Sequence, residues 1–182
     1  NVSAVLLTSS RARPDFTPDF LSDYDIVLYV ADLSPFLNNY LWLGRFGEVM
    51  VRWPYKPQAT LEEFGLTRLV LFTDYVRIDF QITDRLSVGP DQYDDGYKVL
   101  VDKEGITKEL SRPTYTKYII RKPTREEYEE LINDFWWDAA YVPKYLWRDQ
   151  LPFAKYMFAQ AVHDTYLRKI IEWYIGLRNS WS

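Results

Sequence analysis

The stretch Thr8-Ser9-Ser10-Arg11, followed at a short distance by Asp23-Tyr24-Asp25-Ile26, decides how the rest of this sequence is interpreted. An apolar run at residues 2–7 leads into the first motif, and a second apolar run at residues 26–30 leads out of the other. The residues between the motifs are polar and include two prolines, which do not favour a regular element. This order predicts a strand, a turn of small hydroxyl residues, an irregular connection and a neighbouring strand.

The aspartates of the second motif are spaced to share one face of a strand, because side chains at i and i+2 point the same way. Two adjacent carboxylates, Asp23 and Asp25, repel each other, and a divalent cation with oxygen ligands would offset that repulsion. The turn at Ser9, Ser10 and Arg11 offers backbone N–H groups, hydroxyls and a guanidinium, which suit a phosphate. The two motifs therefore predict a metal site beside a phosphate-binding turn.

A third carboxylate, Asp79, lies in an alternating stretch at residues 76–82. Its apolar positions are Val76, Ile78, Phe80 and Ile82, and its polar positions are Arg77, Asp79 and Gln81. If this strand lies next to the Asp23–Asp25 strand, the three carboxylates match a two-metal phosphoryl-transfer site with ions about 3.5–4 Å apart. The alternative is that Asp79 is a surface strand residue paired with Arg77.

The remainder of the first part of the chain reads as a mixed sheet with a helix. Ser34 as N-cap and Pro35 in the first turn predict a helix through Leu43, which Gly44 and Gly47 end. Further strands are predicted at residues 48–53 and 97–101, and the runs at 67–72 and 76–82 predict a hairpin. A turn-rich acidic loop is expected at residues 90–96.

After Pro123 the apolar period changes from that of a strand to that of a helix. Thr124 and Glu127 form a capping box, and Tyr128, Leu131, Ile132, Phe135 and Ala139 are expected to form a buried stripe. Pro143 should kink or break this helix, and a last helix is expected from near Pro152 to Leu177. The predicted fold class is α+β, with a sheet domain at residues 1–123 and a helical domain at residues 124–182.

One face of the first long helix carries polar and aromatic residues at helical spacing: Asp134, Trp137, Tyr141, Lys144 and Arg148. A solvated surface face explains this spacing without any function. The functional interpretation is that the face forms a wall of an active-site cleft. The residues alone leave both interpretations open.

Composition narrows the class of protein. The 182 residues have a net charge of −4 and contain no cysteine, which excludes disulfides and thiolate metal sites and argues against a duplex nucleic-acid binder. No apolar stretch of about 18 residues and no signal peptide is evident. We therefore expect a soluble, cytoplasmic protein with no nucleic acid, membrane or obligatory protein partner.

Several segments together carry a resemblance to a known family. They are Ser10-Arg11, Asp23-Tyr24-Asp25-Ile26, Lys98-Val99-Leu100-Val101-Asp102-Lys103, Lys122-Pro123-Thr124 and Phe135-Trp136, followed by Tyr141 and Lys144. In this order the chain resembles the aminoglycoside 6-adenylyltransferases, or streptomycin adenylyltransferases, of the DNA polymerase β-like nucleotidyltransferase superfamily. The family usually has glycine where this chain has Ser9, an ordinary helix residue at Pro143, and a longer helical C-terminal domain, so the helical domain here is expected to be partial.

The resemblance implies transfer of AMP from ATP to a hydroxyl of a cationic aminoglycoside such as streptomycin, with Mg²⁺ as cofactor. It assigns Asp23, Asp25 and Asp79 to metal binding and catalysis, with Asp79 either a ligand or the general base. For this reaction, the turn at Ser9, Ser10 and Arg11 and the helix residues Tyr141 and Lys144 are expected to bind the nucleotide. Asp134 and Trp137, on the same helix face, are expected to bind the substrate. The alternative is a non-catalytic nucleotide-binding or interaction module, or an isolated fragment, of the same fold.

Overall fold

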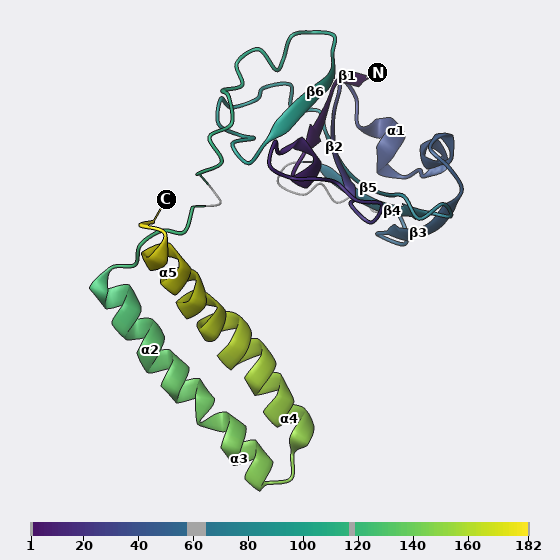
Figure 1. Ribbon diagram of the computed structural model, residues 1–182. Coiled ribbons are helices and arrows are strands. Elements are labelled where there is room, and N and C mark those ends of the chain that lie inside the picture. Colours follow the sequence, from purple (N-terminus) through teal and green to yellow (C-terminus); the bar gives the residue numbers. More distant parts are fainter. Residues whose placement is uncertain (1, 58–64, 117–118, 182) are drawn as a thin grey trace. The chain divides into compact units, whose positions relative to one another are not determined.

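A computed structural model describes residues 2–57, 65–116 and 119–181 of the chain. It divides into two compact units, Asn1–Lys117 and Tyr118–Ser182, each of which is described separately below (Figure 1). The first unit contains all of the described strands, and the second is helical, so the predicted α+β class is confirmed.

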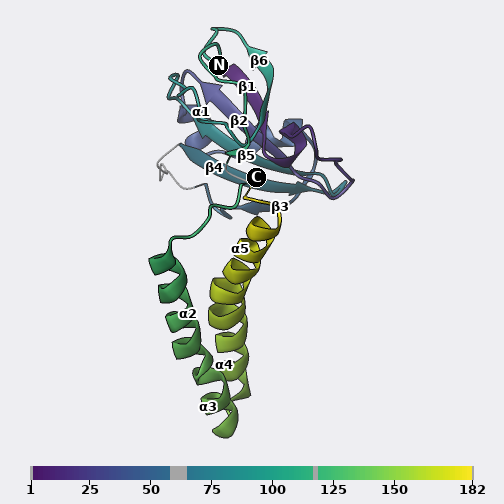
Figure 2. The ribbon, with the colours of Figure 1, turned by 60° about the vertical axis from the view of Figure 1, so that its left-hand side comes forward.

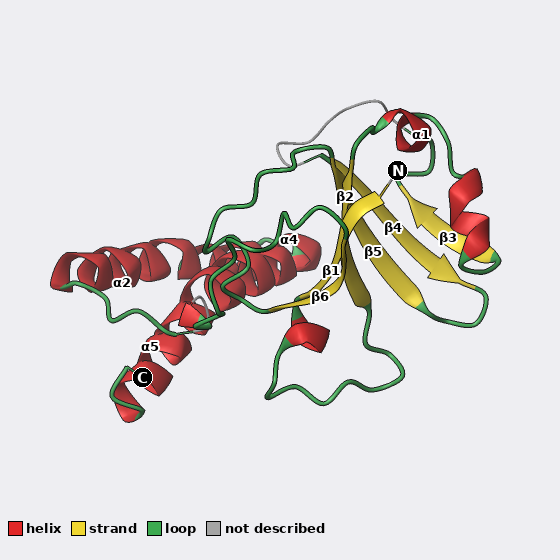
Figure 3. Cartoon of the chain, turned by 90° about the horizontal axis from the view of Figure 1, so that it is seen from above, coloured by secondary structure: helices red, strands yellow, loops and turns green. Residues whose placement is uncertain are grey.

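The first unit is built on one six-stranded mixed sheet. Its strands are β1 (Val2–Thr8), β2 (Tyr24–Val30), β3 (Val49–Trp53), β4 (Leu66–Phe72), β5 (Arg77–Thr83) and β6 (Tyr97–Asp102). They lie in the order β3-β4-β5-β2-β1-β6 (Figure 3). All neighbouring pairs are antiparallel except β2 and β5, which run parallel in the centre. The predicted strands and the β4–β5 hairpin are confirmed.

The register of the central strands brings the polar motifs together. On the parallel pair, Asp25 of β2 lies opposite Asp79 of β5. On the other side of β2, Thr8 at the end of β1 also lies opposite Asp25. Strand β2 begins at Tyr24, so Asp23 directly precedes it. The sheet itself therefore places the Ser9 turn and the two strand aspartates at neighbouring positions.

Each face of the central strands carries a buried apolar cluster. One face carries Leu28, Val30, Phe80 and Ile82, which pack with Phe36 and Leu43 from the helical turns after β2. The opposite face carries Ala4, Leu6, Val27 and Tyr29, against which partly buried residues of the long segment around β6 pack. Strand β2 contributes to both clusters, which explains its continuous apolar run.

The helix predicted from Ser34 to Leu43 is shorter and interrupted. Helix α1 spans Ser34–Leu37, and a separate 3₁₀ turn, η2, spans Leu41–Arg45. Leu33 is the N-cap residue in place of Ser34, whose backbone N–H donates to the Asp32 carboxylate. Between the two turns, the Asn39 side chain accepts from the Leu41 N–H at 2.7 Å. Asparagine side chains compete with helical hydrogen bonds in this way, which explains the interruption.

The second unit contains two helical columns that run side by side (Figure 2). The first consists of α2 (Arg125–Ala139) and α3 (Tyr141–Trp147); the second consists of α4 (Leu151–Tyr156), the π-helical stretch η4 (Met157–Leu167) and α5 (Arg168–Arg178). The Tyr166 hydroxyl donates to the Asp138 carboxylate at 2.8 Å and so joins η4 to α2. The same carboxylate raises the pKa of Tyr166 to about 12.

Two sequence predictions for this unit are confirmed, and one is only partly met. The capping box of Thr124 and Glu127 is present, and the break between α2 and α3 at Ala140 matches the effect expected of Pro143, which lacks an N–H for the preceding turn. The expected buried stripe of α2 is only half-buried, and Tyr128 remains 49% exposed. A pair of columns covers one side of each helix, which leaves such residues partly open to solvent.

A substitution at Gly65, which precedes β4, tests this description of the fold. Its φ is +124°, and an added Cβ would lie 2.1 Å from the Ile82 carbonyl oxygen. We expect Gly65→Ala to lower the free energy of unfolding by about 2 kcal/mol or more, measured by urea denaturation. Gly44→Ala is the control, because no heavy atom lies within 4 Å of its added Cβ. Equal losses in the two variants would contradict this account.

Candidate active site

Two of the three predicted catalytic carboxylates, Asp25 and Asp79, meet where β1 ends beside β2 and β5, whereas Asp23 precedes β2 and does not line the cavity there. Ser9, Asp25 and Asp79 line one cavity of about 250 Å³. Its other lining residues come from the same strands and from β4: Thr8, Ile26, Val27, Thr67, Leu69, Phe80 and Gln81. Sequence analysis did not identify Thr67 or Gln81 as site residues, although both alternate with buried positions on their strands and so face the cavity side of the sheet.

Arg77 binds two of the three predicted catalytic carboxylates. Its guanidinium donates two hydrogen bonds to Asp79, from Nε at 2.9 Å and from Nη2 at 2.6 Å. Its remaining nitrogen lies 3.3 Å from an Asp23 oxygen. The pairing of Asp79 with Arg77 that the sequence left open is therefore present, and it coexists with the cluster of carboxylates. Arg77 links Asp23, which lies just outside the sheet, to Asp79 inside it.

Asp25 lies in an environment that disfavours its charged form. Burial raises the pKa of Asp25, and the charges of Asp79 and Asp23 raise it further. A hydrogen bond from the Ser9 side chain and the charge of Arg77 act in the opposite direction without reversing the shift. A carboxyl group that resists ionisation beside like charges is characteristic of functional sites.

Ser9 has an unusual backbone conformation, with φ of 58° and ψ of −145°. A Cβ is disfavoured at such angles, which glycine adopts without strain. This is the position at which the family that the sequence resembles usually has glycine. The conformation turns the chain sharply from β1 into the short 3₁₀ helix η1 (Ser10–Ala12).

The predicted phosphate-binding residues Ser10 and Arg11 both lie in η1. The Arg11 guanidinium donates to the carbonyl oxygens of Ser22 and Asp23, with the closest distances 2.8 and 2.9 Å, and it lies 3.9 Å from the centre of the Tyr24 ring. These contacts fix the connection that leads into β2. Arg11 thus has a structural role in the described residues, and its contact with phosphate stays a prediction.

Lys98, from the segment that carried the family resemblance, supports the same turn. Its ammonium group donates to the Arg11 carbonyl oxygen at 2.9 Å. The contact joins β6 to η1 across the end of β1, so the turn is held on two sides.

The ligand types in this cluster suit magnesium, because carboxylate oxygens are what hard divalent cations prefer. Their positions do not yet suit it. Among residues 2–57, 65–116 and 119–181, no group of three or more His, Cys, Asp or Glu side chains is arranged as a metal site. Two of the carboxylates are instead bound to Arg77. Magnesium therefore fits the chemistry of the cluster but not its arrangement while Arg77 holds Asp23 and Asp79.

The acidic loop expected at residues 90–96 has a structural explanation at Asp94. Its carboxylate accepts hydrogen bonds from the backbone and hydroxyl groups of Thr114 and Thr116. These bonds lower the pKa of Asp94 far below its ordinary value. The Asp94 carboxylate thus joins two distant parts of the loop region.

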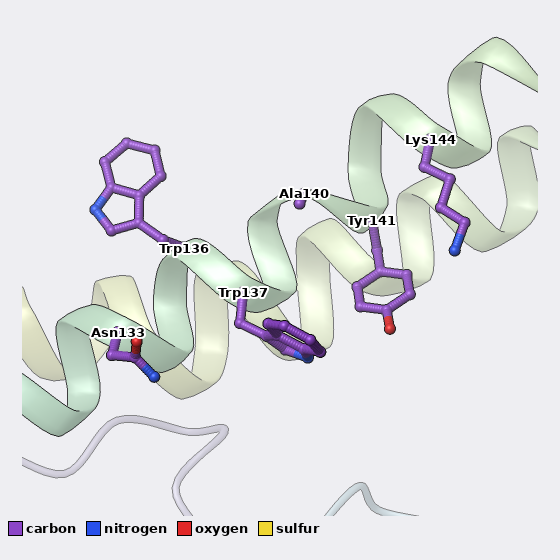
Figure 4. A pocket seen from close by; sticks show the side chains of 6 residues that line it. All are labelled: Asn133, Trp136, Trp137, Ala140, Tyr141 and Lys144. Atoms are coloured by element: carbon purple, nitrogen blue, oxygen red, sulfur yellow. The ribbon is translucent and has the colours of Figure 1, made fainter.

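The remaining predicted site residues belong to the second unit. Trp137, Tyr141 and Lys144 line a cavity of about 450 Å³ and project to the same side of their helices (Figure 4). The Lys144 ammonium lies 4.8 Å from the centre of the Tyr141 ring. Sequence analysis missed three residues that also line this cavity: Asn133, Trp136 and Ala140. Their spacing along the helix was the signal that could have identified them.

Asp134 does not line that cavity. Its carboxylate accepts a hydrogen bond from the Asn133 side chain at 3.1 Å, and the residue is half-buried. The assignment of Asp134 and Trp137 to the substrate, and of Tyr141 and Lys144 to the nucleotide, stays a prediction.

In the described part of the chain, none of the helices combines the length and the apolar character needed to cross a bilayer.

Comparison with known proteins identifies the family. The family model described as streptomycin adenylyltransferase matches residues 1–182. The chain belongs to this family. It is 29% identical to an aminoglycoside 6-adenylyltransferase of Staphylococcus aureus over 100% of its own length and 66% of that protein. It is 32% identical to the Campylobacter jejuni protein of the same name, over 97% of the chain and 62% of that protein.

A relative of the family has a solved structure. The crystal structure of an aminoglycoside 6-adenyltransferase from Bacillus subtilis matches 98% of the chain and 62% of its own chain, with 25% identity and a TM-score of 0.39. The 182-residue chain spans 62–66% of the length of the curated relatives that it matches.

The backbone strain at Ser9 can be measured with two substitutions. Ser9→Ala and Ser9→Gly both remove the hydroxyl that bonds Asp25, but only glycine also removes the Cβ. We expect the glycine variant to be more stable than the alanine variant by about 1–2 kcal/mol, because the φ of 58° is strained only when a Cβ is present. Urea denaturation measures the difference. If alanine is the more stable of the two, the turn is not strained.

Burial of Asp25 and its repulsion by Asp79 and Asp23 predict how stability depends on pH without metal. The pKa of Asp25 is raised on folding, so wild-type stability should fall as pH rises from the ordinary value of 3.8 through the raised value. Asp25→Asn removes this loss and should melt at a higher temperature than wild type at pH 7 in EDTA. The gain should disappear in acid, where Asp25 is protonated in both states.

Asp94→Asn is the control, because this substitution should change the stability at pH 7 in the direction opposite to that of Asp25→Asn. Hydrogen bonds from Thr114 and Thr116 lower the pKa of Asp94, so its contribution is present above 3.8 and is lost as pH falls. This variant should therefore be less stable than wild type at pH 7. An Asp25→Asn variant that melts no higher than wild type at pH 7 would contradict the proposed repulsion.

Proposed function

We propose that this family member transfers AMP from ATP to a hydroxyl group of a cationic aminoglycoside such as streptomycin, the type of reaction that gives antibiotic resistance. One observation carries the proposal: Asp25 and Asp79 lie at paired positions on parallel strands, beside the Ser9 turn. Family membership supports the same reaction. The names of the relatives support an aminoglycoside acceptor.

Each residue of the cluster has a role in this proposal. Ser9, Ser10 and the leading N–H groups of η1 bind the nucleotide phosphates, because the first N–H groups of a helical turn lack partners within it. Asp79 accepts the proton of the acceptor hydroxyl, or holds the metal; both roles use a carboxylate that lines the same cavity as Asp25. Lys144 and Tyr141 bind the nucleotide, and Asp134 and Trp137 bind the acceptor.

Magnesium is the proposed cofactor, and Asp23, Asp25 and Asp79 would hold it. When bound, it would neutralise charge on the phosphates and on the departing pyrophosphate. The carboxylates of this chain orient the phosphates relative to the acceptor hydroxyl. In-line transfer requires that hydroxyl opposite the departing pyrophosphate, and correct orientation of the two groups is itself a large part of catalysis.

A second candidate is a non-catalytic nucleotide-binding module of the same fold. The observation that favours it is the double hydrogen bond from Arg77 to Asp79, which occupies the carboxylate that a catalytic site needs. The Ser9 residue in place of the usual glycine also fits this candidate. A turnover assay distinguishes the two.

We expect pyrophosphate release when the protein is given ATP, Mg²⁺ and a panel of aminoglycosides, and we expect no release without an aminoglycoside. Asp25→Asn should reduce turnover by about 100-fold or more, since the lost stabilisation amounts to several kcal/mol. Asp94→Asn, whose side chain has a structural role, is the control for an altered surface charge. ATP binding without turnover by any acceptor would favour the non-catalytic module.

A further inference from the structure

Arg77 makes the densest set of charge contacts at the carboxylate cluster. It donates two parallel hydrogen bonds to Asp79 and lies 3.3 Å from Asp23. Its charge also acts on Asp25. One guanidinium therefore interacts with all three carboxylates that the proposed function assigns to magnesium, and it is the cation that offsets their repulsion in the described structure.

The position of Arg77 on its strand explains this reach. Residues i and i+2 of a strand share a face, so the side chains of Arg77 and Asp79 lie side by side on β5. The forked guanidinium matches a carboxylate with two hydrogen bonds and still has a nitrogen left for Asp23. A lysine at this position would supply the charge but not the fork.

The side chains of Arg77 and Asp79 differ in how far they are exposed to solvent. The Arg77 side chain is 47% exposed, whereas that of Asp79 is only 18% exposed. Arg77 can thus rotate toward solvent without disturbing the core, while Asp79 stays in place on the central strand β5. Exposed ion pairs are weak, and only the doubled geometry and the network of three acids make this one persistent.

We propose that Arg77 is a positioning residue that takes the place of the divalent cation in the metal-free protein and leaves the carboxylates when the cation binds. This inference rests on the proposed function for the identity of the cation. The guanidinium and the metal compete for the same oxygens, so Arg77 keeps the cluster folded and lowers its affinity for metal. The chain thereby avoids an uncompensated group of three acids before metal and nucleotide arrive.

The test measures Mn²⁺ binding to the whole chain in the absence of nucleotide. Binding is monitored by electron paramagnetic resonance as a loss of the signal of free Mn²⁺. Arg77→Gln should bind Mn²⁺ about fivefold or more tightly than wild type, because it removes the competing charge. Arg77→Lys, which keeps the charge but lacks the fork, should lie between the two. Circular dichroism checks that each variant is folded.

Arg13→Gln is the matched control. Arg13 also binds a carboxylate with two hydrogen bonds, that of Asp15, in the same unit, and it does not line the cavity that contains Asp25 and Asp79. The substitution makes the same change in net charge. A general effect of charge would tighten Mn²⁺ binding equally in Arg13→Gln and Arg77→Gln.

The outcomes separate this inference from the proposed function. Tighter binding by Arg77→Gln than by Arg13→Gln supports the competition. Equal binding by these variants, with Mn²⁺ bound by wild type, overturns the competition but leaves the magnesium site intact. Weaker binding by Arg77→Gln also overturns it and makes Arg77 an organiser of the ligands. No binding by wild type or by Arg77→Gln overturns both the competition and the proposed magnesium site.

Discussion

The parallel pairing of β2 with β5 is the constraint on which the rest of the site depends. It sets Asp25 opposite Asp79 in the centre of the sheet, where neither residue can move away without breaking the register. Like charges at paired positions repel, and burial of Asp25 increases the cost. The apolar residues on both faces, which hold β2 and β5 together, stabilise the sheet against this repulsion.

Two neighbouring features reduce the same repulsion by different means. Arg77 supplies positive charge to the cluster, and Ser9 supplies a hydrogen bond to Asp25. The second contribution has a cost of its own, since the Ser9 backbone has a conformation that suits glycine. The hydroxyl therefore gives a physical reason for a serine at a strained position. The hydrogen bond to the buried Asp25 carboxylate offsets part of the conformational strain that the Ser9 Cβ causes.

The sheet was predictable from sequence because its signals are local and strong. Alternation at residues 76–82 and the continuous apolar run of β2 specified strands, and Asp79 on the polar face followed from period two alone. The cluster was predicted only on the condition that the Asp79 strand lies next to the Asp25 strand. Local sequence does not fix that pairing, because the arrangement of the whole sheet determines which strands are neighbours. The interrupted helix after Ser34 was mispredicted because one Asn39 side-chain bond outweighed the apolar spacing. The contacts of Arg77 and Arg11 depend on side-chain rotamers, which no sequence pattern specifies.

The helical unit shows why a face defined by spacing does not by itself identify a ligand. Trp137, Tyr141 and Lys144 line one cavity, as helical geometry requires of residues three and four apart. The Lys144 ammonium already has a partner there, the Tyr141 ring, and cation–π contacts at such exposed positions are weak. A phosphate could therefore draw Lys144 away from the ring at little cost. Asp134 lies outside this cavity, so the helix presents its aromatic and acidic groups at separate places. Trp137, which the proposed function assigns to the acceptor together with Asp134, shares this cavity with the two residues that it assigns to the nucleotide, so helical spacing brings residues into one cavity without dividing them between ligands.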